Sequence, residues 1–146
     1  ILQNKLKTIE VETNYGTDIR LECQPSKLGQ VFLNVITNAA YASGKTDQAE
    51  GPKIVISTMR EETTVLVEIR DNGQGIDPSV IETLFDPFVT TKPVGEGTGL
   101  GLSVSYDIIQ QHNGEISVHN DLGAVFTIRI PTFRNKSEQE VIPHET

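Results

Sequence analysis

The sequence has no tryptophan, one methionine and one cysteine among its 146 residues. A single cysteine cannot form an internal disulfide, so nothing in the sequence points to an oxidising compartment. Because Cys23 follows Ile19 and Leu21 in an alternating run, we expect a small core residue there rather than a reactive thiol. No run approaches the roughly 20 apolar residues of a membrane span, and no signal-peptide pattern opens the chain. We expect a soluble, cytoplasmic domain, with membrane anchoring of the parent protein left open.

Basic residues are also scarce, since 12 Lys and Arg stand against 20 Asp and Glu and give a net charge of -8. Nucleic acids and anionic membranes reward clustered positive charge, so neither is expected as a partner. With 36% hydrophobic residues, the chain can bury one ordinary core. We therefore expect one α/β domain over residues 1–131, followed by a charged tail or linker over residues 132–146.

Hydrophobic periodicity places the expected helices and strands. Alternating apolar residues on both sides of a turn near Gly16 predict a hairpin that opens the domain. From Ser26 the apolar positions follow the three-and-four spacing of an amphipathic helix, which Gly44 stops. We further expect strands at 54–59 and 65–70, a short helix at 77–84, a long mobile loop at 86–98, a second long helix at 99–112 capped by Asn113 and Gly114, and a closing hairpin with strands near 116–118 and 126–130.

Two asparagines on the first long helix are the first candidate for a site. Asn34 and Asn38 lie four residues apart and therefore stack on one face of the helix. At about 100° per residue they fall beside the apolar stripe, so their amides would look along the edge of the core. This position suits the wall of a pocket, and a pair of ordinary surface asparagines is the alternative.

A second candidate is the sequence Asp-Asn-Gly-Gln-Gly-Ile, which follows a predicted strand directly. Period two places Asp71 on the inward face at the end of that strand. A buried, ionised carboxylate needs hydrogen-bond donors, because leaving it unpaired costs several kcal/mol. Gly73 and Gly75 remove Cβ atoms where a flat ligand could lie close to the backbone. An ordinary Asp-x-Gly turn is the alternative.

Glycine also occupies every second position from Gly95 to Gly101, immediately before the second long helix. Such a backbone can adopt positive φ and expose N–H groups as a nest for an anion, and the helix N-terminus points into the same space. Phosphate is the natural occupant, and a flexible hinge is the alternative. The stretch contains neither G-x-x-x-x-G-K-[ST] nor G-x-G-x-x-G, so a different nucleotide-binding fold is required.

Taken in this order, the motifs resemble those of the ATP-binding catalytic domain of sensor histidine kinases. The wider superfamily includes DNA gyrase, mismatch-repair and heat-shock chaperone ATPases. The resemblance covers about residues 7–131 and includes an asparagine box at 34–39, a first glycine box at 71–75, a phenylalanine box at 85–88 and a second glycine box at 95–102. The loop sequence at 90–93 is similar to that of nitrogen-regulation kinases. The resemblance implies a two-layer α/β sandwich of the Bergerat type, with a mixed, mostly antiparallel sheet packed on helices.

The resemblance also implies a site for ATP and Mg²⁺. Asp71 would accept a hydrogen bond from the adenine amino group, while Asn38, assisted by Asn34, would hold Mg²⁺ through its amide oxygen. Residues 85–97 would form a lid, and Lys92 would contact the γ-phosphate unless it is a solvated loop lysine. Asn34 and Lys92 are the expected catalytic residues. The residues expected to contact the nucleotide are Asn34, Asn38, Tyr41, Asp71, Gly73, Gly75, Ile76, Phe88, Lys92, Gly97, Thr98, Gly99, Leu100, Gly101 and Leu102.

The residue at position 34 distinguishes the histidine kinases that the chain resembles from other members of the superfamily. The ATPases and serine kinases usually carry a glutamate general base at this position, whereas this chain has Asn34. An amide cannot take a proton at neutral pH, so the sequence favours phosphoryl transfer to histidine over hydrolysis. Related kinases often have a lysine where this chain has Tyr41, which shifts phosphate contact toward the second glycine box and Lys92. The chain's own histidines lack the acceptor pattern, and we expect them to be structural or exposed: His112, His119 and His144.

The acceptor histidine is therefore expected on a separate helical dimerisation domain, with this chain as the catalytic domain that follows it. The phosphorylated histidine would then serve the receiver domain of a response regulator. We expect the parent kinase to be a homodimer and this fragment to be a monomer. Two alternatives remain: a self-sufficient ATPase of the gyrase and chaperone type, and an interaction module that works without nucleotide.

Overall fold

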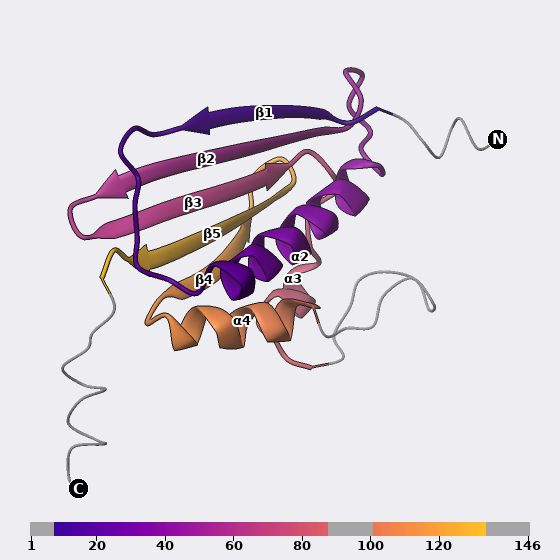
Figure 1. Ribbon diagram of the computed structural model, residues 1–146. Coiled ribbons are helices and arrows are strands. Elements are labelled where there is room, and N and C mark those ends of the chain that lie inside the picture. Colours follow the sequence, from indigo (N-terminus) through magenta and orange to yellow (C-terminus); the bar gives the residue numbers. More distant parts are fainter. Residues whose placement is uncertain (1–7, 88–100, 134–146) are drawn as a thin grey trace, which may run out of the picture.

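A five-stranded sheet with helices on one face makes up the protein (Figure 1). The computed structural model describes residues 8–87 and 101–133. In chain order the elements are β1 (Glu10–Tyr15), α2 (Pro25–Ser43), β2 (Lys53–Glu61), β3 (Thr64–Asp71), α3 (Pro78–Ile81), α4 (Gly101–Gln111), β4 (Glu115–Asn120) and β5 (Ala124–Pro131). The strand order is β1-β2-β3-β5-β4, with β1 parallel to β2 and the other neighbours antiparallel. This confirms the predicted two-layer α/β fold.

The core lies between the sheet and α2, with α4 beside it. Alternate residues of β3 are buried, and cross-strand pairing places them level with apolar residues of β5, for example Ile69 opposite Phe126. On α2 the buried stripe is the one that the periodicity predicts: Leu28, Val31, Val35 and Ala39. The helix also contains asparagines, a glycine and several β-branched residues, which are weak helix formers. Its stability must therefore come mainly from burial, at about 1.5–3 kcal/mol for each large apolar side chain.

The ends of the long helices agree closely with the sequence signals. Pro25 occupies the first turn of α2. The helix ends at Gly44, whose N–H donates a hydrogen bond to the carbonyl of Ala40. After α4, Asn113 has a φ of 60°, and Gly114 donates to the carbonyl of Ile109 at 2.9 Å. This geometry forms the predicted C-cap at Asn113 and Gly114, with Asn113 rather than the glycine in the left-handed conformation. No helix among the described residues is long and apolar enough to cross a bilayer.

The predicted opening hairpin is wrong. β1 pairs in parallel with β2, and residues 19–24 form no strand. A parallel pair needs a crossover, and residues 16–24 together with α2 supply it. Within this crossover Ile19, Leu21 and Cys23 pack against the core, so their alternation reflects an extended chain with one side buried rather than a paired strand. Cys23 is half-buried, in keeping with a packing role.

The remaining sequence predictions are largely confirmed where the structure describes them. Strands β2, β3, β4 and β5 lie where the periodicity places them. The short helix begins as predicted, with the Asp77 carboxylate accepting from the Ser79 N–H at 2.9 Å, but it ends at Ile81 and turns follow it. Most of the loop expected at 86–98, the start of the second helix at 99–100, and nearly all of the tail lie outside the described residues.

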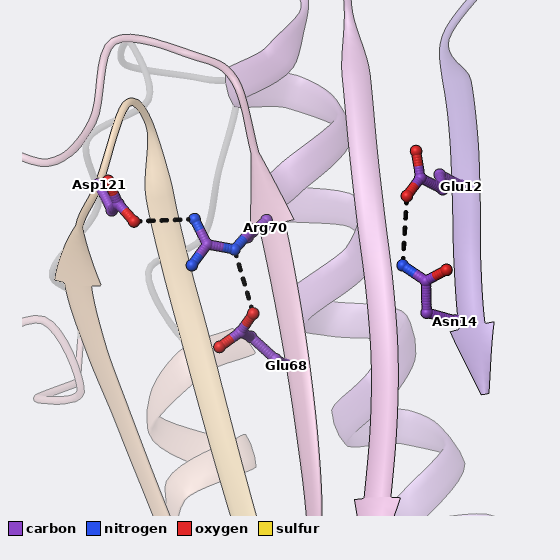
Figure 2. A network of polar contacts seen from close by, with 5 residues as sticks. All are labelled: Glu12, Asn14, Glu68, Arg70 and Asp121. Carbon is purple, nitrogen blue, oxygen red and sulfur yellow. Dashed lines mark hydrogen bonds and ion pairs between the residues drawn. The ribbon is translucent and has the colours of Figure 1, made fainter. Parts of the chain in front are cut away.

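The sheet face that points away from the helices carries polar side chains (Figure 2). Arg70 lies between Glu68 and Asp121, with N–O distances of 3.1 Å to each. Near the edge of the sheet, Asn14 donates to Glu12 at 3.2 Å. Exposed ion pairs of this kind contribute little to stability, so this face is the solvated side of the sheet. The pair between Arg70 and Asp121 nonetheless links the end of β3 to the turn between β4 and β5.

His112 connects the end of α4 to the start of α2. Its side chain is 1% exposed, and Nε2 accepts a hydrogen bond from the Gln24 N–H at 3.1 Å. An imidazole nitrogen that accepts is unprotonated, so Nδ1 carries the proton and donates to the carbonyl of Ile108 at 2.8 Å. The histidine is therefore structural, as expected, whereas His119 lies exposed on β4.

We expect His112→Ala to lower the free energy of unfolding by about 2–4 kcal/mol, because it leaves a cavity and a backbone N–H without its acceptor. Urea denaturation measures this difference. The matched control, His119→Ala, should stay within about 0.5 kcal/mol of the wild type. An effect at His112 no larger than that of the control would show that its ring does not hold the helices together.

Candidate functional site

Asp71, the last residue of β3, is a buried carboxylate at one end of the core. It is 5% exposed, and Oδ1 accepts from the N–H of Gly73 at 2.9 Å and from that of Ala124 at 3.2 Å. Both hydrogen bonds that the described residues make to this carboxylate fall on Oδ1. The side chain also lines a narrow cavity of about 60 Å³. The predicted inward position is confirmed, and Oδ2 is available to a donor in that cavity.

Burial raises the pKa of Asp71 above its ordinary value, and the two backbone N–H groups offset part of this effect. The folded protein therefore binds a proton at this carboxylate more tightly than the unfolded chain does. At neutral pH the charged side chain consequently lowers the stability of the fold. A group that is kept at the expense of stability and borders a cavity is a candidate for function.

The first glycine box packs tightly against other parts of the protein. A Cβ atom at Gly73 would collide with the backbone carbonyl of Ala42 on α2. Gly75 has a φ of +82°, and a Cβ atom there would lie 2.9 Å from Oδ1 of Asn120. Both glycines are thus required by the fold itself. The sequence interpretation, which assigned the open space to a ligand, missed these protein contacts.

The two asparagines of α2 lie side by side at the edge of the core, as predicted, and both are half-buried. Asn38 Nδ2 donates to the carbonyl of Asn34 at 3.1 Å. Asn34 Nδ2 donates to the carbonyl of Gly101 at 3.1 Å and to Ser105 Oγ at 3.2 Å. Protein acceptors thus hold both amide nitrogens, and no hydrogen bond from the described residues reaches either Oδ1. Amide oxygens are hard ligands that suit Mg²⁺.

Helix α4 contributes Ser105, which sequence reasoning missed. Ser105 is 0% exposed, and its hydroxyl donates to the carbonyl of Gly101 at 2.8 Å while it accepts from Asn34. This small network fixes the orientation of the Asn34 carboxamide. Within the described part of the chain, no cluster of three or more His, Cys, Asp or Glu side chains could hold a metal ion.

The cavity beside Asp71 brings together many of the predicted residues from distant parts of the chain. Six of them line it: Asn38, Tyr41, Asp71, Gly75, Ile76 and Leu102. Gly73 borders Asp71, and Gly101 contacts Asn34. The other predicted contacts lie outside the described residues: Phe88, Lys92, Gly97, Thr98, Gly99 and Leu100.

The sequence did not reveal four further residues of this lining: Ala42, Leu84, Ala124 and Phe126. Ala124 and Phe126 belong to the inward-facing row of β5, and only the cross-strand register places them beside Asp71. Beside Tyr41, Lys45 lies about one turn later in the chain, with Nζ 5.0 Å from the centroid of the tyrosine ring. Lys45 therefore brings a positive charge to the face of the Tyr41 ring, although position 41 itself has no lysine.

Comparisons with known proteins agree with this geometry. Residues 23–134 match the family of histidine kinase-, DNA gyrase B-, and HSP90-like ATPases. Sensor histidine kinase ZraS of Salmonella typhi is 38% identical over 121 residues, which cover 82% of this chain and 25% of ZraS. The sensory histidine kinase/phosphatase NtrB of Vibrio alginolyticus is 35% identical, covering 92% of this chain and 43% of NtrB. The chain therefore spans about a quarter of ZraS and less than half of NtrB.

Solved structures show the same fold. The catalytic domain of histidine kinase ThkA superposes with a TM-score of 0.77 at 35% identity, covering 88% of this chain and 82% of that chain. ThkA in complex with response regulator protein TrrA gives a TM-score of 0.73 at 32% identity, with 88% of this chain and 35% of that chain covered. Together with the buried aspartate and the paired asparagines, these matches show that the chain belongs to the histidine kinase-, DNA gyrase B- and HSP90-like ATPase family, as a histidine kinase catalytic domain.

Proposed function

We propose that this chain binds Mg²⁺ and ATP and transfers the γ-phosphate to a histidine on a separate dimerisation domain. The observation that carries the proposal is the cavity that Asp71 and Asn38 both line, with the hydrogen bonds to Asp71 on Oδ1 and the Asn38 amide nitrogen bonded to a protein carbonyl. The catalytic domain spans residues 1–131, and residues 132–146 form a tail or linker. Because it consumes ATP, we place this domain in the cytoplasm.

Asp71 is suited to recognise adenine. Its Oδ2 can accept a hydrogen bond from the exocyclic amino group, and guanine, with a carbonyl at that position, would be repelled. Apolar side chains of Ile76, Leu84 and Phe126 line the same cavity and can pack against the faces and edges of a purine. Base recognition therefore combines one charged acceptor with apolar walls.

The asparagines of α2 are suited to the phosphate end of the nucleotide. Fixing each amide nitrogen by a protein acceptor leaves the amide oxygens of Asn34 and Asn38 to coordinate a hard cation. A bound Mg²⁺ would neutralise charge on the transferring phosphoryl group. Lys92 and residues 97–100 are proposed as further phosphate contacts, with Phe88 in the lid that covers them.

The identity of the residue at position 34 favours a histidine acceptor. The described lining of the cavity contains one carboxylate, Asp71, and it lies at the base end. The amide of Asn34 cannot remove a proton from water or from a hydroxyl group. A neutral imidazole already presents a nucleophilic lone pair, so positioning is most of what the catalytic domain must provide.

We further propose that the phosphohistidine serves the receiver domain of a response regulator. The structural match to ThkA in complex with the response regulator TrrA supports this partner. The parent kinase would act as a homodimer, because the acceptor lies on a dimerisation domain, and the catalytic fragment alone would be a monomer. Phosphoryl transfer then passes through two separately folded domains.

A transfer assay with radiolabelled ATP tests this function. The chain is mixed with the histidine-bearing dimerisation domain of its parent kinase, and label should appear on that domain as an acid-labile, base-stable phosphohistidine. The same domain with the acceptor histidine replaced by alanine should remain unlabelled. Steady release of phosphate without any acceptor domain, at a rate that matches transfer, would instead indicate a self-sufficient ATPase.

Asp71→Asn should strongly weaken ATP binding without unfolding the protein. The asparagine oxygen can still accept from Gly73 and Ala124, but its NH₂ group would face the adenine amino group, donor against donor. We expect ATP affinity to fall by about 100-fold or more, as for other sites with an unmatched buried polar group. Calorimetry with ATP measures the loss.

The same variant checks the raised pKa of Asp71. Because burial disfavours the charged form, Asp71→Asn should gain most stability relative to the wild type at neutral pH. The gain should shrink as the pH falls through the raised pKa toward the ordinary aspartate value, where the wild-type side chain becomes protonated. Urea denaturation of both proteins at pH 7 and pH 4 measures it. A relative gain that grows toward acid pH would contradict this account.

A further inference from the structure

Asn120, the last residue of β4, holds the backbone of Ile76, the residue directly after the first glycine box. Its Oδ1 accepts from the N–H of Ile76 at 2.9 Å, and its Nδ2 donates to the carbonyl of the same residue at 2.7 Å. One side chain thus engages both backbone groups of a residue that lines the cavity. Asn120 itself lines a wider cavity of about 330 Å³ that adjoins the first one at Gly75. Asn120 is absent from the lining of the smaller cavity and supports its wall from outside.

The segment that Asn120 holds depends on isolated contacts, among them the packing of Gly73 against Ala42. Residues 72–76 belong to no helix or strand, so no regular ladder fixes their backbone. At the start of the segment, Asn72 donates to the carbonyl of Gly51 at 2.8 Å and accepts from the N–H of Lys53 at 3.0 Å. At its end, the two bonds to Asn120 have the corresponding role. Between these two anchor points lies Gly75, whose backbone has a positive φ. Because glycine has no side chain, its backbone dihedral angles are less restricted than those of other residues.

Asn120 immediately precedes a turn that is tied to the same strand end as Asp71. Ala124 donates its N–H to Asp71 Oδ1, and Asp121 pairs with Arg70, the residue before Asp71 (Figure 2). Within the turn, the N–H of Asp121 donates to the carbonyl of Gly123 at 2.8 Å. The β4–β5 hairpin therefore contacts the carboxylate through Ala124 and, through Asn120, the residue that directly follows the first glycine box. It sets the spacing between the acceptor oxygen and the wall beside it.

We propose that Asn120 is a positioning residue for purine recognition. By fixing Ile76, it keeps the glycine box in the conformation that aligns a base with Oδ2 of Asp71. This inference rests on the proposed function, in which that oxygen accepts from the adenine amino group. Without the clamp, rotation about Gly75 allows the wall to shift, and the base no longer meets the carboxylate in a fixed register.

The test compares the affinities for ATP and GTP, measured by calorimetry on the whole chain. Asn120→Ala should weaken ATP binding by about tenfold, the effect of losing a modest pair of hydrogen bonds. GTP binding does not depend on the acceptor at Asp71 and should weaken less, so the preference for ATP should fall several-fold. Asn120→Asp keeps the acceptor for the Ile76 N–H but sets a carboxylate oxygen against the Ile76 carbonyl, and it should be at least as defective.

Asn14→Ala is the matched control, because it removes one exposed asparagine bond at the far edge of the sheet. It should leave both affinities and their ratio unchanged. Partial unfolding lowers the apparent affinity for both nucleotides by the same factor, so a purely structural role of Asn120 would leave the ratio intact. An unchanged ratio in Asn120→Ala, with or without weaker binding, overturns the positioning role.

The proposed function fails separately. A wild-type protein that shows no preference for ATP over GTP overturns base recognition by Asp71, and it does so before any variant is measured. A clear wild-type preference that survives intact in Asn120→Ala overturns only the role of Asn120. A preference that falls in both Asn120 variants and not in the control supports the inference.

Discussion

The site depends on the carboxylate of Asp71, whose hydrogen bonds from the described residues all fall on one of its two oxygens. Two backbone N–H groups, from Gly73 in the following turn and from Ala124 on the neighbouring strand, both bond to Oδ1 of Asp71. They hold the side chain, which lines the cavity, in one orientation and leave Oδ2 without a hydrogen bond from the described residues. Since burial still raises the pKa of this group, its hydrogen bonds do not fully offset desolvation. The apolar core behind it must therefore supply the stability that the charge removes.

The one-sided arrangement of helices explains where the cavity lies. Both long helices and the sheet enclose apolar side chains, and the cavity lies at one end of this layer, beside the last residue of β3. Its walls combine core residues such as Phe126 and Leu84 with the polar ends of elements, including Asp71. The opposite face of the sheet takes no part in the cavity and carries solvated ion pairs such as that of Arg70 (Figure 2). The cavity is therefore an open end of the core.

Local periodicity made most of this fold predictable, and its limits are visible at β1. Period two is a property of neighbouring residues, so it correctly placed Asp71 on the inward face of its strand. It could not choose a partner for β1, because the alternation at residues 19–23 describes equally well a paired strand and an extended crossover packed on the core. Asn120 escaped notice for a related reason. Its contact with Ile76 joins residues 44 positions apart and depends on the register of the β4–β5 hairpin.

The packing of α4 gives a structural reason for the amide at position 34. The carbonyl of Gly101 accepts from Asn34 Nδ2 and from the Ser105 hydroxyl, so position 34 must supply an N–H donor to this network. A glutamate has no such donor when ionised, and its oxygens would face a carbonyl oxygen in a half-buried setting. The contact that fastens the last glycine of the second glycine box to α2 therefore also disfavours a general base there. The amide at position 34 and the docking of α4 on α2 are thus linked by the same hydrogen bond.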